Sequence, residues 1–516
     1  MMQDTPLLEA YVKKILTAQV YDVAIETPLS PMPLLSQRLG NQISIKREDL
    51  QPVFSFKIRG AYNRLASLTD AQRRKGVVTA SAGNHAQGVA LGAKQLGIRA
   101  VIVMPRITPD IKVAAVRGHG AEVVLTGDNF NEALDCAREL ITQEGLTYVA
   151  PFDDADVIAG QGTVAMEILR QHQGPIDAIF VPVGGGGLIA GITAYVKYLY
   201  PNVTVIGVEP EDAACLKAAL EAGRPTTLDQ VGVFAEGVAV ATIGELPFDI
   251  LKDHIDGVVT VNADEMCSAV KDIFEDTRGL PETSGAVALA GLKKYIRQNN
   301  VQGQRFVCIN SGANINFDRL NHITERTSLG ERREAMLAVS VPECAGTYKA
   351  LCEALSNRMV TQLSYRYAHH SDAQVLVGIN ITPSDDDADR HALISSLEDA
   401  GYPVVDLSDN EMAKVHISHL VGGHMLPTLP EELHEELYRF EFPERPGALN
   451  NFVRQLPIHW NISLFHYRNH GAAYGRVLVA LQMPKGEQDG LDKHLDEIGY
   501  RYWRETDNPA YGLFLR

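Results

Sequence analysis

A single lysine, Lys57, interrupts the apolar stretch "QPVFSFKIRGAYNRL" at residues 51–65. The common interpretation is structural, because a lysine stem covers apolar surface while its ammonium group reaches water. A lysine held away from water has a lowered pKa instead, and its neutral amine can act as a nucleophile and a base. Lys57 is therefore a candidate for amine chemistry, provided that other functional segments converge on it.

A glycine run, Gly184–Leu188 ("GGGGL"), follows the apolar run "AIFVPV" and precedes the helical pattern "IAGITAYVKYLY". Consecutive glycines let backbone N–H groups close around an anion, and the N-terminus of a helix adds positive potential there. The alternative is a flexible turn, which the flanking strand and helix make less favourable. We therefore predict that this run binds a phosphate group.

The glycine run also fits a dinucleotide fingerprint, Gly185-x-Gly187-x-x-Ala190, and Glu209 closes the next strand. In that fingerprint an acidic residue binds the ribose, so this window alone predicts an NAD-dependent dehydrogenase. The fingerprint usually opens a nucleotide-binding domain, whereas several strands precede it here. The dehydrogenase hypothesis also gives Lys57 no task.

Two further motifs end strands. "SAGNHAQG" (Ser81–Gly88) contains Asn84, which could cap a helix or hold a ligand hydroxyl or carboxylate. "NSGAN" (Asn310–Asn314) contains Ser311, which could cap the next segment or direct its hydroxyl at a ligand. Ligands of open parallel sheets bind at the carboxyl ends of the strands. The convergence of these motifs, more than any one of them, predicts a single site.

The elements that must position these residues alternate from about residue 42 to 315. Short β-rich runs are separated by amphipathic helical segments such as "HAQGVALGAKQLG", "NEALDCARELITQEG" and "EMCSAVKDIFEDT". Near-continuous apolar strands separated by helices predict a parallel sheet covered on both faces, hence a doubly wound α/β region of two lobes. The predicted strands are "ISIKRE", "GVVTASAG", "AVIVMP", "EVVLTG", "AIFVPVG", "VTVIGVEP" and "RFVCINSG".

After the polar stretch 321–334 the chain repeats itself. "VPECAGTYKAL" at 341–351 matches "FPERPGALNNF" at 442–452, and "YRYAHHSDAQVLVGI" at 365–379 matches "YRNHGAAYGRVLVAL" at 467–481. A third match joins "AGYPVVDLSDN" to "IGYRYWRETDN". Each repeat predicts strand–helix–strand–strand–helix–strand, the order of a small antiparallel α+β sandwich.

Composition excludes several classes of protein. The chain has 516 residues and a formal net charge of −17, which disfavours binding to nucleic acid or an anionic membrane. Four consecutive glycines interrupt the longest apolar run, so we expect no membrane helix, and the N-terminus carries no secretory signal pattern. The cysteines form no C-x-x-C pair, so we expect free thiols of a reducing cytoplasm and no metal site. They are Cys136, Cys215, Cys267, Cys308, Cys344 and Cys352.

In order and spacing, the motifs "SFKIRGA", "SAGNHAQG", "GGGGL" and "SGAN" resemble those of fold type II pyridoxal-phosphate enzymes. Within them, the chain is similar over essentially its whole length to biosynthetic threonine dehydratases, also called threonine ammonia-lyases or threonine deaminases. That resemblance implies a catalytic domain over residues 1–325. It also implies two ACT-like regulatory domains, over 335–409 and 436–508.

The resemblance also assigns the cofactor-binding residues. Lys57 would form the Schiff base with pyridoxal 5'-phosphate, Asn84 would contact its 3-hydroxyl, and Ser311 would contact its pyridine nitrogen. The phosphate would be held by Gly184, Gly185, Gly186, Gly187 and Leu188. There is one departure: the family has E-P-S-G-A or E-P-T-G-A where this chain has "ETSGA", with Thr283 replacing the proline. That replacement puts the rigidity of the loop in doubt.

The expected reaction is β-elimination, with Lys57 as the base at the substrate Cα. L-threonine, and also L-serine, would be dehydrated and deaminated, threonine giving 2-oxobutanoate and ammonia in the first committed step of isoleucine biosynthesis. No histidine or carboxylate near the motifs is an obvious proton donor to the leaving hydroxyl, so the cofactor phosphate is the expected acid. The resemblance further implies a cytoplasmic homotetramer inhibited by isoleucine, with valine opposing the inhibition.

Two other hypotheses stay open beside the dehydrogenase. A serine racemase or a catabolic serine/threonine dehydratase would use the same cofactor motifs. Such enzymes generally lack the double C-terminal unit, and the racemases tend to carry a serine, as second proton donor, where this chain has Ala82. A non-catalytic amino-acid sensor is the third hypothesis, but a sensor has no use for the Lys57 amine.

Overall fold

The structure, a computed structural model, describes residues 5–317, 319–330, 333–342, 360–366, 372–382, 387–417, 433–443, 460–468, 474–487 and 490–515, with positions 351, 354–355, 358, 452 and 455–457. It divides into two compact units, Met1–Asn316 and Phe317–Arg516. The first contains all four cofactor motifs, and the second contains the repeat.

The larger sheet of the first unit has six strands in the order β1-β2-β10-β7-β8-β9. All neighbours pair in parallel except β1, which lies antiparallel at the edge. The strands are β1 (Leu29–Pro31), β2 (Gln42–Arg47), β7 (Ala178–Pro182), β8 (Thr204–Pro210), β9 (Gly257–Val261) and β10 (Arg305–Asn310).

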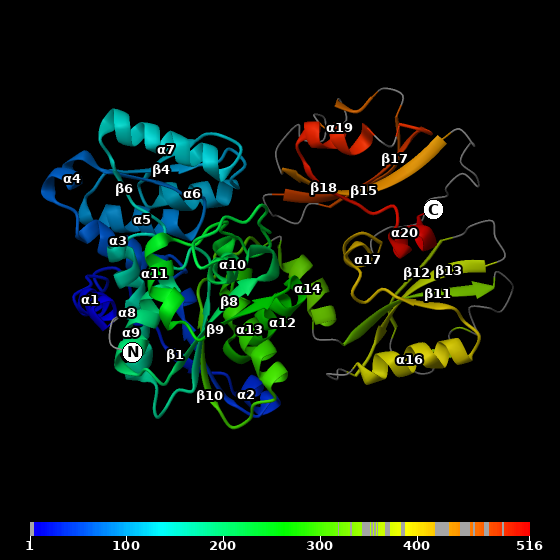
Figure 1. The fold of residues 1–516 in the computed structure, drawn as a ribbon, viewed down its shortest axis with the longest axis horizontal. Helices are drawn as coiled ribbons and strands as arrows, with labels where there is room; N and C mark the ends of the chain where they lie inside the picture. Colours follow the sequence, from blue (N-terminus) through cyan, green and yellow to red (C-terminus); the bar gives the residue numbers. More distant parts are fainter. Residues whose placement is uncertain are drawn as a thin grey trace. The chain divides into compact units, whose positions relative to one another are not determined.

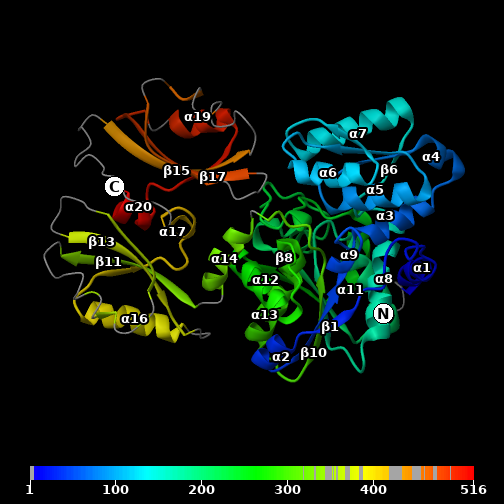
Figure 2. The same ribbon diagram turned by 180° about the vertical axis from the view of Figure 1, so that it is seen from behind.

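Helices cover this sheet on both faces, as apolar parallel strands require. Figures 1 and 2 show α12 (Ala263–Thr277) and α13 (Thr283–Asn299) on one side. On the other side lie α8 (Ala155–Gln171) and α9 (Gly187–Leu199), against which α1 (Thr5–Leu16) packs. This second layer forms the largest core cluster of the unit, with Ile158, Ile189 and Val196 fully buried.

The smaller sheet has four parallel strands in the order β5-β4-β3-β6. One face packs on α3, α5 and α6, and the other on α7. The strands are β3 (Val77–Ala80), β4 (Ala100–Met104), β5 (Glu122–Leu125) and β6 (Thr147–Tyr148). The helices are α3 (Lys57–Ala66), α5 (Asn84–Leu96), α6 (Asp110–Gly118) and α7 (Phe130–Glu144).

The remaining helical elements of the unit are short. They are α2 (Pro33–Leu39), α4 (Asp70–Lys75), α10 (Cys215–Ala222), α11 (Glu245–His254) and the 3-10 turns Glu48–Leu50, Glu211–Ala213 and Glu236–Val238. The predicted two-lobed α/β region and its seven named strands are confirmed. The prediction missed β1 and β6, which are too short to show a period, and did not name β9, which is only half-buried.

In the second unit the polar stretch after the catalytic motifs forms helix α14 (Arg319–Gly330), so the predicted boundary at 325 lies inside a helix. Two antiparallel sheets follow, β12-β13-β11-β14 and β16-β17-β15-β18. Their strands are β11 (Glu334–Pro342), β12 (Val360–Arg366), β13 (Asp372–Asn380), β14 (Val404–Asp406), β15 (Leu433–Pro443), β16 (Asn461–Arg468), β17 (Tyr474–Pro484) and β18 (Arg501–Arg504).

The repeat is confirmed by topology, because both sheets have the strand order second-third-first-fourth. Both also shift register at matching places, between Val360 and Gln362 and between Ile462 and Leu464. The helices that pack on them are α16 (Ala388–Asp399) and α19 (Leu491–Ile498). The first helix of each repeat lies outside the described residues or among the single positions. The resemblance to ACT-like domains implies that the turns Pro342–Gly346 and Pro443–Gly447 border the effector pockets, and apart from the two prolines these turns also lie outside the described residues.

Two short helices, α17 (Glu411–Val415) and α20 (Pro509–Phe514), were not predicted. Both contribute to a core cluster that the two sheets share, in which Leu437, Leu478 and Tyr511 are buried. The predicted regulatory ranges 335–409 and 436–508 leave these helices out. The two repeats therefore form one unit with a common core.

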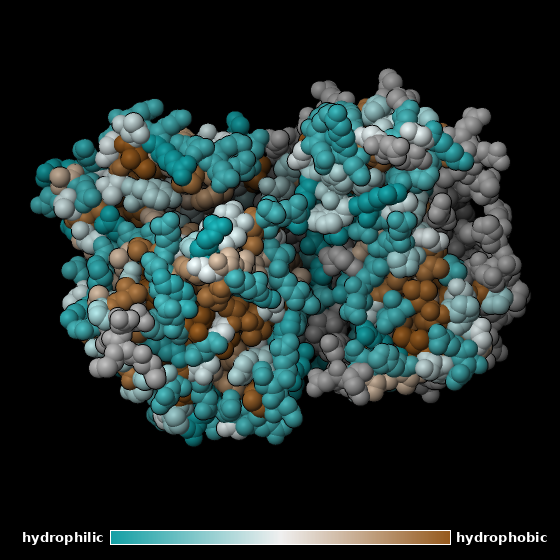
Figure 3. All heavy atoms as spheres, viewed as in Figure 1, coloured by the Kyte–Doolittle hydropathy of each residue, from teal (hydrophilic) through white to brown (hydrophobic). Residues whose placement is uncertain are grey.

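The face in Figure 3 is mostly hydrophilic with scattered apolar patches, in keeping with the net charge of −17. No helix in the described ranges is long and apolar enough to span a membrane. Within those ranges no group of three or more histidine, cysteine and acidic side chains could hold a metal ion. The described cysteines, Cys136, Cys215, Cys267 and Cys308, form no disulfide bonds with one another; Cys344 and Cys352 lie outside the described residues.

Candidate active site

Lys57 is the first residue of α3, and its Nζ donates a hydrogen bond of 2.9 Å to the carbonyl of Pro151. Desolvation lowers the pKa of Lys57 to about 8, and the negative charge of Glu282 opposes that shift only in part. A carbonyl partner cannot balance a positive charge as a carboxylate would, so the neutral amine is accessible near physiological pH. This environment is the one that the chemical interpretation of Lys57 requires.

The segment before Lys57 is hydrogen-bonded to the segment around Ser311. Phe56 N–H donates to the carbonyl of Ser311 at 3.2 Å, and Ala313 N–H donates to the carbonyl of Phe54 at 2.8 Å. Phe54 adopts φ +55°, a left-handed conformation that is strained for an aromatic residue. These bonds hold the strained turn, and they bring the lysine and the serine motifs together.

The glycine run leads into the first turn of α9, which begins at Gly187 and has no side-chain cap. Its first backbone N–H groups are therefore available to an anion. The run tolerates no side chains: a Cβ on Gly185 would lie 2.2 Å from the Phe152 ring, and one on Gly187 would lie 3.1 Å from the Phe152 backbone. Gly186 has φ +92°, which also favours glycine.

Asn84 is not a helix cap, because the cap of α5 is Gly83. Its amide instead lies between two residues that are distant in sequence. Asn84 Nδ2 donates to Glu282 Oε1 at 2.6 Å, and Asn314 Nδ2 donates to Asn84 Oδ1 at 2.7 Å. The amide is thus held by hydrogen bonds at both ends.

Ser311 directly follows β10 and is buried. Its hydroxyl donates to the carbonyl of Ser284 at 3.3 Å. Ser284 Oγ in turn accepts a 2.8 Å hydrogen bond from the N–H of Gly237. The serine is therefore oriented by the first turn of α13.

Thr283, which replaces the proline of the family motif, is the first residue of α13 and is 3% exposed. Its hydroxyl donates a hydrogen bond of 2.8 Å to the carbonyl of Phe234. Proline would restrict this position through its ring. In this chain a side-chain hydrogen bond ties the loop instead.

A carboxylate and a histidine lie near the motifs, although the sequence identified neither as an obvious proton donor. Glu282 contacts Asn84, and His85, whose ring Nε2 lies 3.0 Å from the carbonyl of Val149, is buried beside it. Burial, with the charge of Lys57, lowers the pKa of His85 to about 3, so its ring is neutral. Sequence reasoning gave no role to Glu282 or Asn314, although both stand in the quoted motifs "ETSGA" and "NSGAN".

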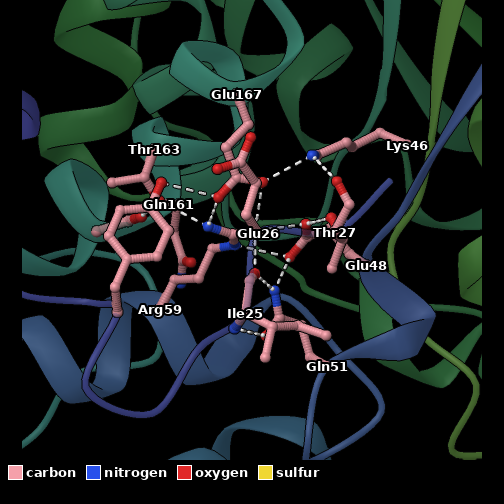
Figure 4. Close-up of polar contacts among 12 residues, drawn as sticks. Ile25, Glu26, Thr27, Lys46, Glu48, Gln51, Arg59, Gln161, Thr163 and Glu167 are labelled. Atoms are coloured by element: carbon pink, nitrogen blue, oxygen red, sulfur yellow. Dashed lines mark hydrogen bonds and ion pairs between the residues drawn. The ribbon is translucent and has the colours of Figure 1, made fainter. Parts of the chain in front are cut away.

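A buried ionic cluster anchors the helix that carries Lys57. Figure 4 shows Arg59 between Glu48 and Glu167, to which it donates hydrogen bonds of 2.7 and 2.6 Å. Lys46 Nζ lies 2.6 Å from the other oxygen of Glu167, and all four side chains are fully buried. Because removing one member would leave a buried charge without a partner, this cluster favours a single position of α3.

Comparison with known proteins agrees with this geometry. Residues 20–312 match the family of pyridoxal-phosphate-dependent enzymes, and residues 325–417 and 429–515 match the C-terminal regulatory domain of threonine dehydratase. The biosynthetic L-threonine dehydratase of Salmonella typhimurium is 53% identical over 505 residues, which cover 98% of this chain and 97% of the relative.

The chain belongs to the biosynthetic threonine dehydratase family. It is a pyridoxal-phosphate-dependent enzyme of fold type II, with two regulatory domains of antiparallel sheet after the catalytic part. The mitochondrial threonine dehydratase of Saccharomyces cerevisiae is a more distant relative, 48% identical over 98% of this chain and 89% of its own length.

Solved structures match the catalytic fold. The processed form of threonine deaminase isoform 2 from Solanum lycopersicum is 49% identical, with a TM-score of 0.62 over 63% of this chain and 94% of that chain. Serine racemase from Dictyostelium discoideum is 32% identical, with a TM-score of 0.56 over 59% of this chain and 99% of that chain.

The residues present fit pyridoxal phosphate. The glycine run forms a cradle that a Cβ would fill, with the uncapped turn of α9 beside it. Lys57 supplies an amine of lowered pKa for the aldehyde, and Ser311 supplies a buried hydroxyl. An anion cradle, an amine and uncharged polar groups are the donor set that this cofactor requires.

The dinucleotide interpretation of the same glycines is wrong, since the matched family uses pyridoxal phosphate. The structure also gives Glu209 another task. Its buried carboxylate accepts hydrogen bonds from the N–H groups of Leu216 and Lys217, at 2.7 and 3.0 Å, in the first turn of α10. Glu209 therefore caps a helix, where the fingerprint would have it bind a ribose.

Proposed function

We propose that this chain dehydrates and deaminates L-threonine to 2-oxobutanoate and ammonia, with L-serine as a second substrate, in the first committed step of isoleucine biosynthesis. The observation that carries the proposal is the Lys57 amine, with its pKa lowered to about 8, at the meeting point of three strand-end motifs. Similarity over 98% of the chain to a biosynthetic L-threonine dehydratase supports this substrate.

In this proposal Lys57 has two roles. Its amine would attach the bound cofactor, and the same amine, once free, would take the proton from the substrate Cα. Bound pyridoxal phosphate supplies the electron sink that makes this proton removable. A lysine whose pKa is about 8 is largely neutral above that pH, so it can perform both tasks without a second base.

The other site residues hold and tune the cofactor. Gly184–Leu188 would bind its phosphate through backbone N–H groups, and Asn84 would contact its 3-hydroxyl. Ser311 contacts the pyridine nitrogen with a hydroxyl that carries no charge. An uncharged partner leaves that nitrogen largely neutral, which weakens the electron sink and favours prompt loss of the β-hydroxyl over transamination.

The regulatory unit is proposed to bind isoleucine as inhibitor and valine as its antagonist. The match of residues 325–417 and 429–515 to the threonine dehydratase regulatory domain supports an effector role. Inhibition requires isoleucine to bind the less active state more tightly, with a coupling of about 1–3 kcal/mol. We further propose that the enzyme acts as a homotetramer in the cytoplasm.

The test is Lys57→Ala, with the exposed Lys94→Ala as matched control. Lys57→Ala should abolish 2-oxobutanoate formation from threonine, because attachment point and base are lost together. Lys94→Ala should keep the wild-type rate. Threonine turnover by Lys57→Ala above the rate of free cofactor would refute the role of Lys57. An inactive wild type that shows no absorption band of bound cofactor would refute the function itself.

A further inference from the structure

We propose that Asn314 and Glu282 are positioning residues that fix the direction of the Asn84 amide. In the fixed direction Asn84 presents an N–H group to the 3-oxygen of the cofactor, which is thereby held as a hydrogen-bond acceptor. The inference rests on the proposed function, since it takes the contact between Asn84 and that oxygen from it.

The direction is set from both ends of a chain of hydrogen bonds. Asn314 Nδ2 donates to the backbone carbonyl of Val53 at 2.8 Å, and a carbonyl can only accept. The Asn314 NH₂ group is therefore turned toward Val53 and Asn84, and the Asn84 atom 2.7 Å from it must be the acceptor Oδ1. A flip of either amide would bring two acceptors or two donors face to face.

The hydrogen bond to Glu282 independently fixes the same orientation of the Asn84 amide. Asn84 Nδ2 lies 2.6 Å from Glu282 Oε1, and an ionised carboxylate can only accept. The NH₂ group of Asn84 therefore faces Glu282. A backbone carbonyl at one end and a carboxylate at the other leave one arrangement of the whole chain that satisfies every contact.

These contacts determine which group of the Asn84 amide can bind a ligand. Its carbonyl oxygen accepts from Asn314, and one of its two N–H groups is used by Glu282. The remaining N–H makes Asn84 a donor, and its place at the start of α5 adds the positive potential of a helix N-terminus. A donor in this potential favours the anionic form of the cofactor's 3-oxygen.

Asn314→Asp is the discriminating variant. It keeps the shape of residue 314 but places a carboxylate against Asn84 Oδ1, so the Asn84 amide must turn over or be repelled. We expect the dissociation constant for pyridoxal phosphate to rise roughly tenfold. We also expect the long-wavelength absorption band of the bound cofactor to lose intensity to its near-ultraviolet band. The matched control is Asn299→Asp, the same change on the exposed end of α13.

Asn314→Ala separates positioning from simple packing. If Asn314 fixes polarity, the aspartate variant is more impaired than the alanine variant. If Asn314 only fills space, the order reverses, because aspartate keeps the shape and alanine does not. Circular dichroism and thermal unfolding of each apo protein establish that the variants are folded.

Glu282→Gln changes the other hydrogen-bond partner of the Asn84 amide, and it provides the test if Asn314→Asp does not fold. A glutamine can accept or donate, so the Asn84 amide becomes free to turn, and the absorption should shift in the same direction. Wild-type affinity and absorption in Asn314→Asp or Glu282→Gln would overturn the inference. A wild-type protein that does not bind the cofactor through Lys57 would instead overturn the proposed function.

Discussion

The buried position of Lys57 lowers the pKa of its amine and so changes its chemistry. Burial lowers its pKa from 10.5 to about 8, and its Nζ donates a hydrogen bond to the neutral carbonyl of Pro151. Between these two pH values the unfolded chain binds a proton that the folded chain does not. Stability should therefore rise with pH in that window, so Lys57 destabilises the fold at neutral pH. Function, not stability, accounts for a lysine at this position.

The lowered pKa predicts how the apo protein captures its cofactor. Only the neutral amine can attack the aldehyde, so the rate of covalent capture should rise with pH and level off above about 8. Stopped-flow absorbance of apo protein mixed with pyridoxal phosphate, at constant ionic strength, measures this rate. A midpoint near 10.5, the ordinary lysine value, would show that the site does not desolvate Lys57.

Ser311 supports a second prediction at this scale. Ser311→Asp would place a carboxylate where a buried hydroxyl now donates to the Ser284 carbonyl. The charge should protonate the cofactor's ring nitrogen and strengthen the electron sink, so elimination should fall and transamination should appear. Product analysis by chromatography after incubation with threonine measures the ratio. An unchanged rate and product ratio would show that Ser311 does not determine the reaction type.

At the scale of elements, the glycine run and the segment at Phe152 form one structural feature. The run follows β7 and opens α9, and the Phe152 ring occupies the space where a side chain on Gly185 would lie. The close approach is possible because Gly185 has no side chain. The cradle therefore depends on both segments.

Gly185→Ala should weaken cofactor binding without unfolding the protein. Its Cβ would lie 2.2 Å from the Phe152 ring, and relieving that contact must displace either the ring or the cradle. We expect roughly a 10- to 100-fold rise in the cofactor dissociation constant, the equivalent of overpacking by about 1–3 kcal/mol. Equilibrium dialysis against pyridoxal phosphate measures it.

The control is Gly118→Ala at the end of α6, where an added Cβ meets nothing within 4 Å. Adding Phe152→Ala to Gly185→Ala should recover part of the lost affinity, because the truncated side chain makes room. Equal affinities of Gly185→Ala and the wild type would mean that the glycine is not needed to shape the cradle.

At the scale of the whole molecule, catalysis and regulation occupy separate units. Each described sheet lies entirely within one unit, and the catalytic unit has its own core clusters. The regulatory unit has a core shared by both repeats. A division of this kind predicts that the catalytic unit can work without the regulatory unit.

A chain ending at Gly330, after α14, should therefore retain threonine dehydration and lose its response to isoleucine. Rates of 2-oxobutanoate formation are compared for this chain and the full-length protein, each with and without isoleucine. Loss of a coupling of about 1–3 kcal/mol corresponds to a roughly 5- to 150-fold difference in effector sensitivity. Equal inhibition of both chains would place the effector site in the catalytic unit.

Sequence patterns predicted most of the strands and helices of the catalytic unit, the internal repeat, and the polar motifs that follow the strands. These features are local: apolar periodicity, glycine runs and repeated segments are visible within a short window. They were enough to predict the fold class, a phosphate-binding run and the position of Lys57 at the start of a helix, whereas the cofactor was predicted from the resemblance of four motifs to a known family.

The contacts between motifs that are distant in sequence depend on the tertiary fold. Asn84 contacts Glu282, 198 residues away, and Asn314, 230 residues away, and no local pattern encodes either pairing. The direction of an amide depends on what lies at both of its ends, and the pKa of Lys57 depends on which groups surround it. Spacing in the sequence carries neither quantity, because the folded chain brings these groups together only through its sheets.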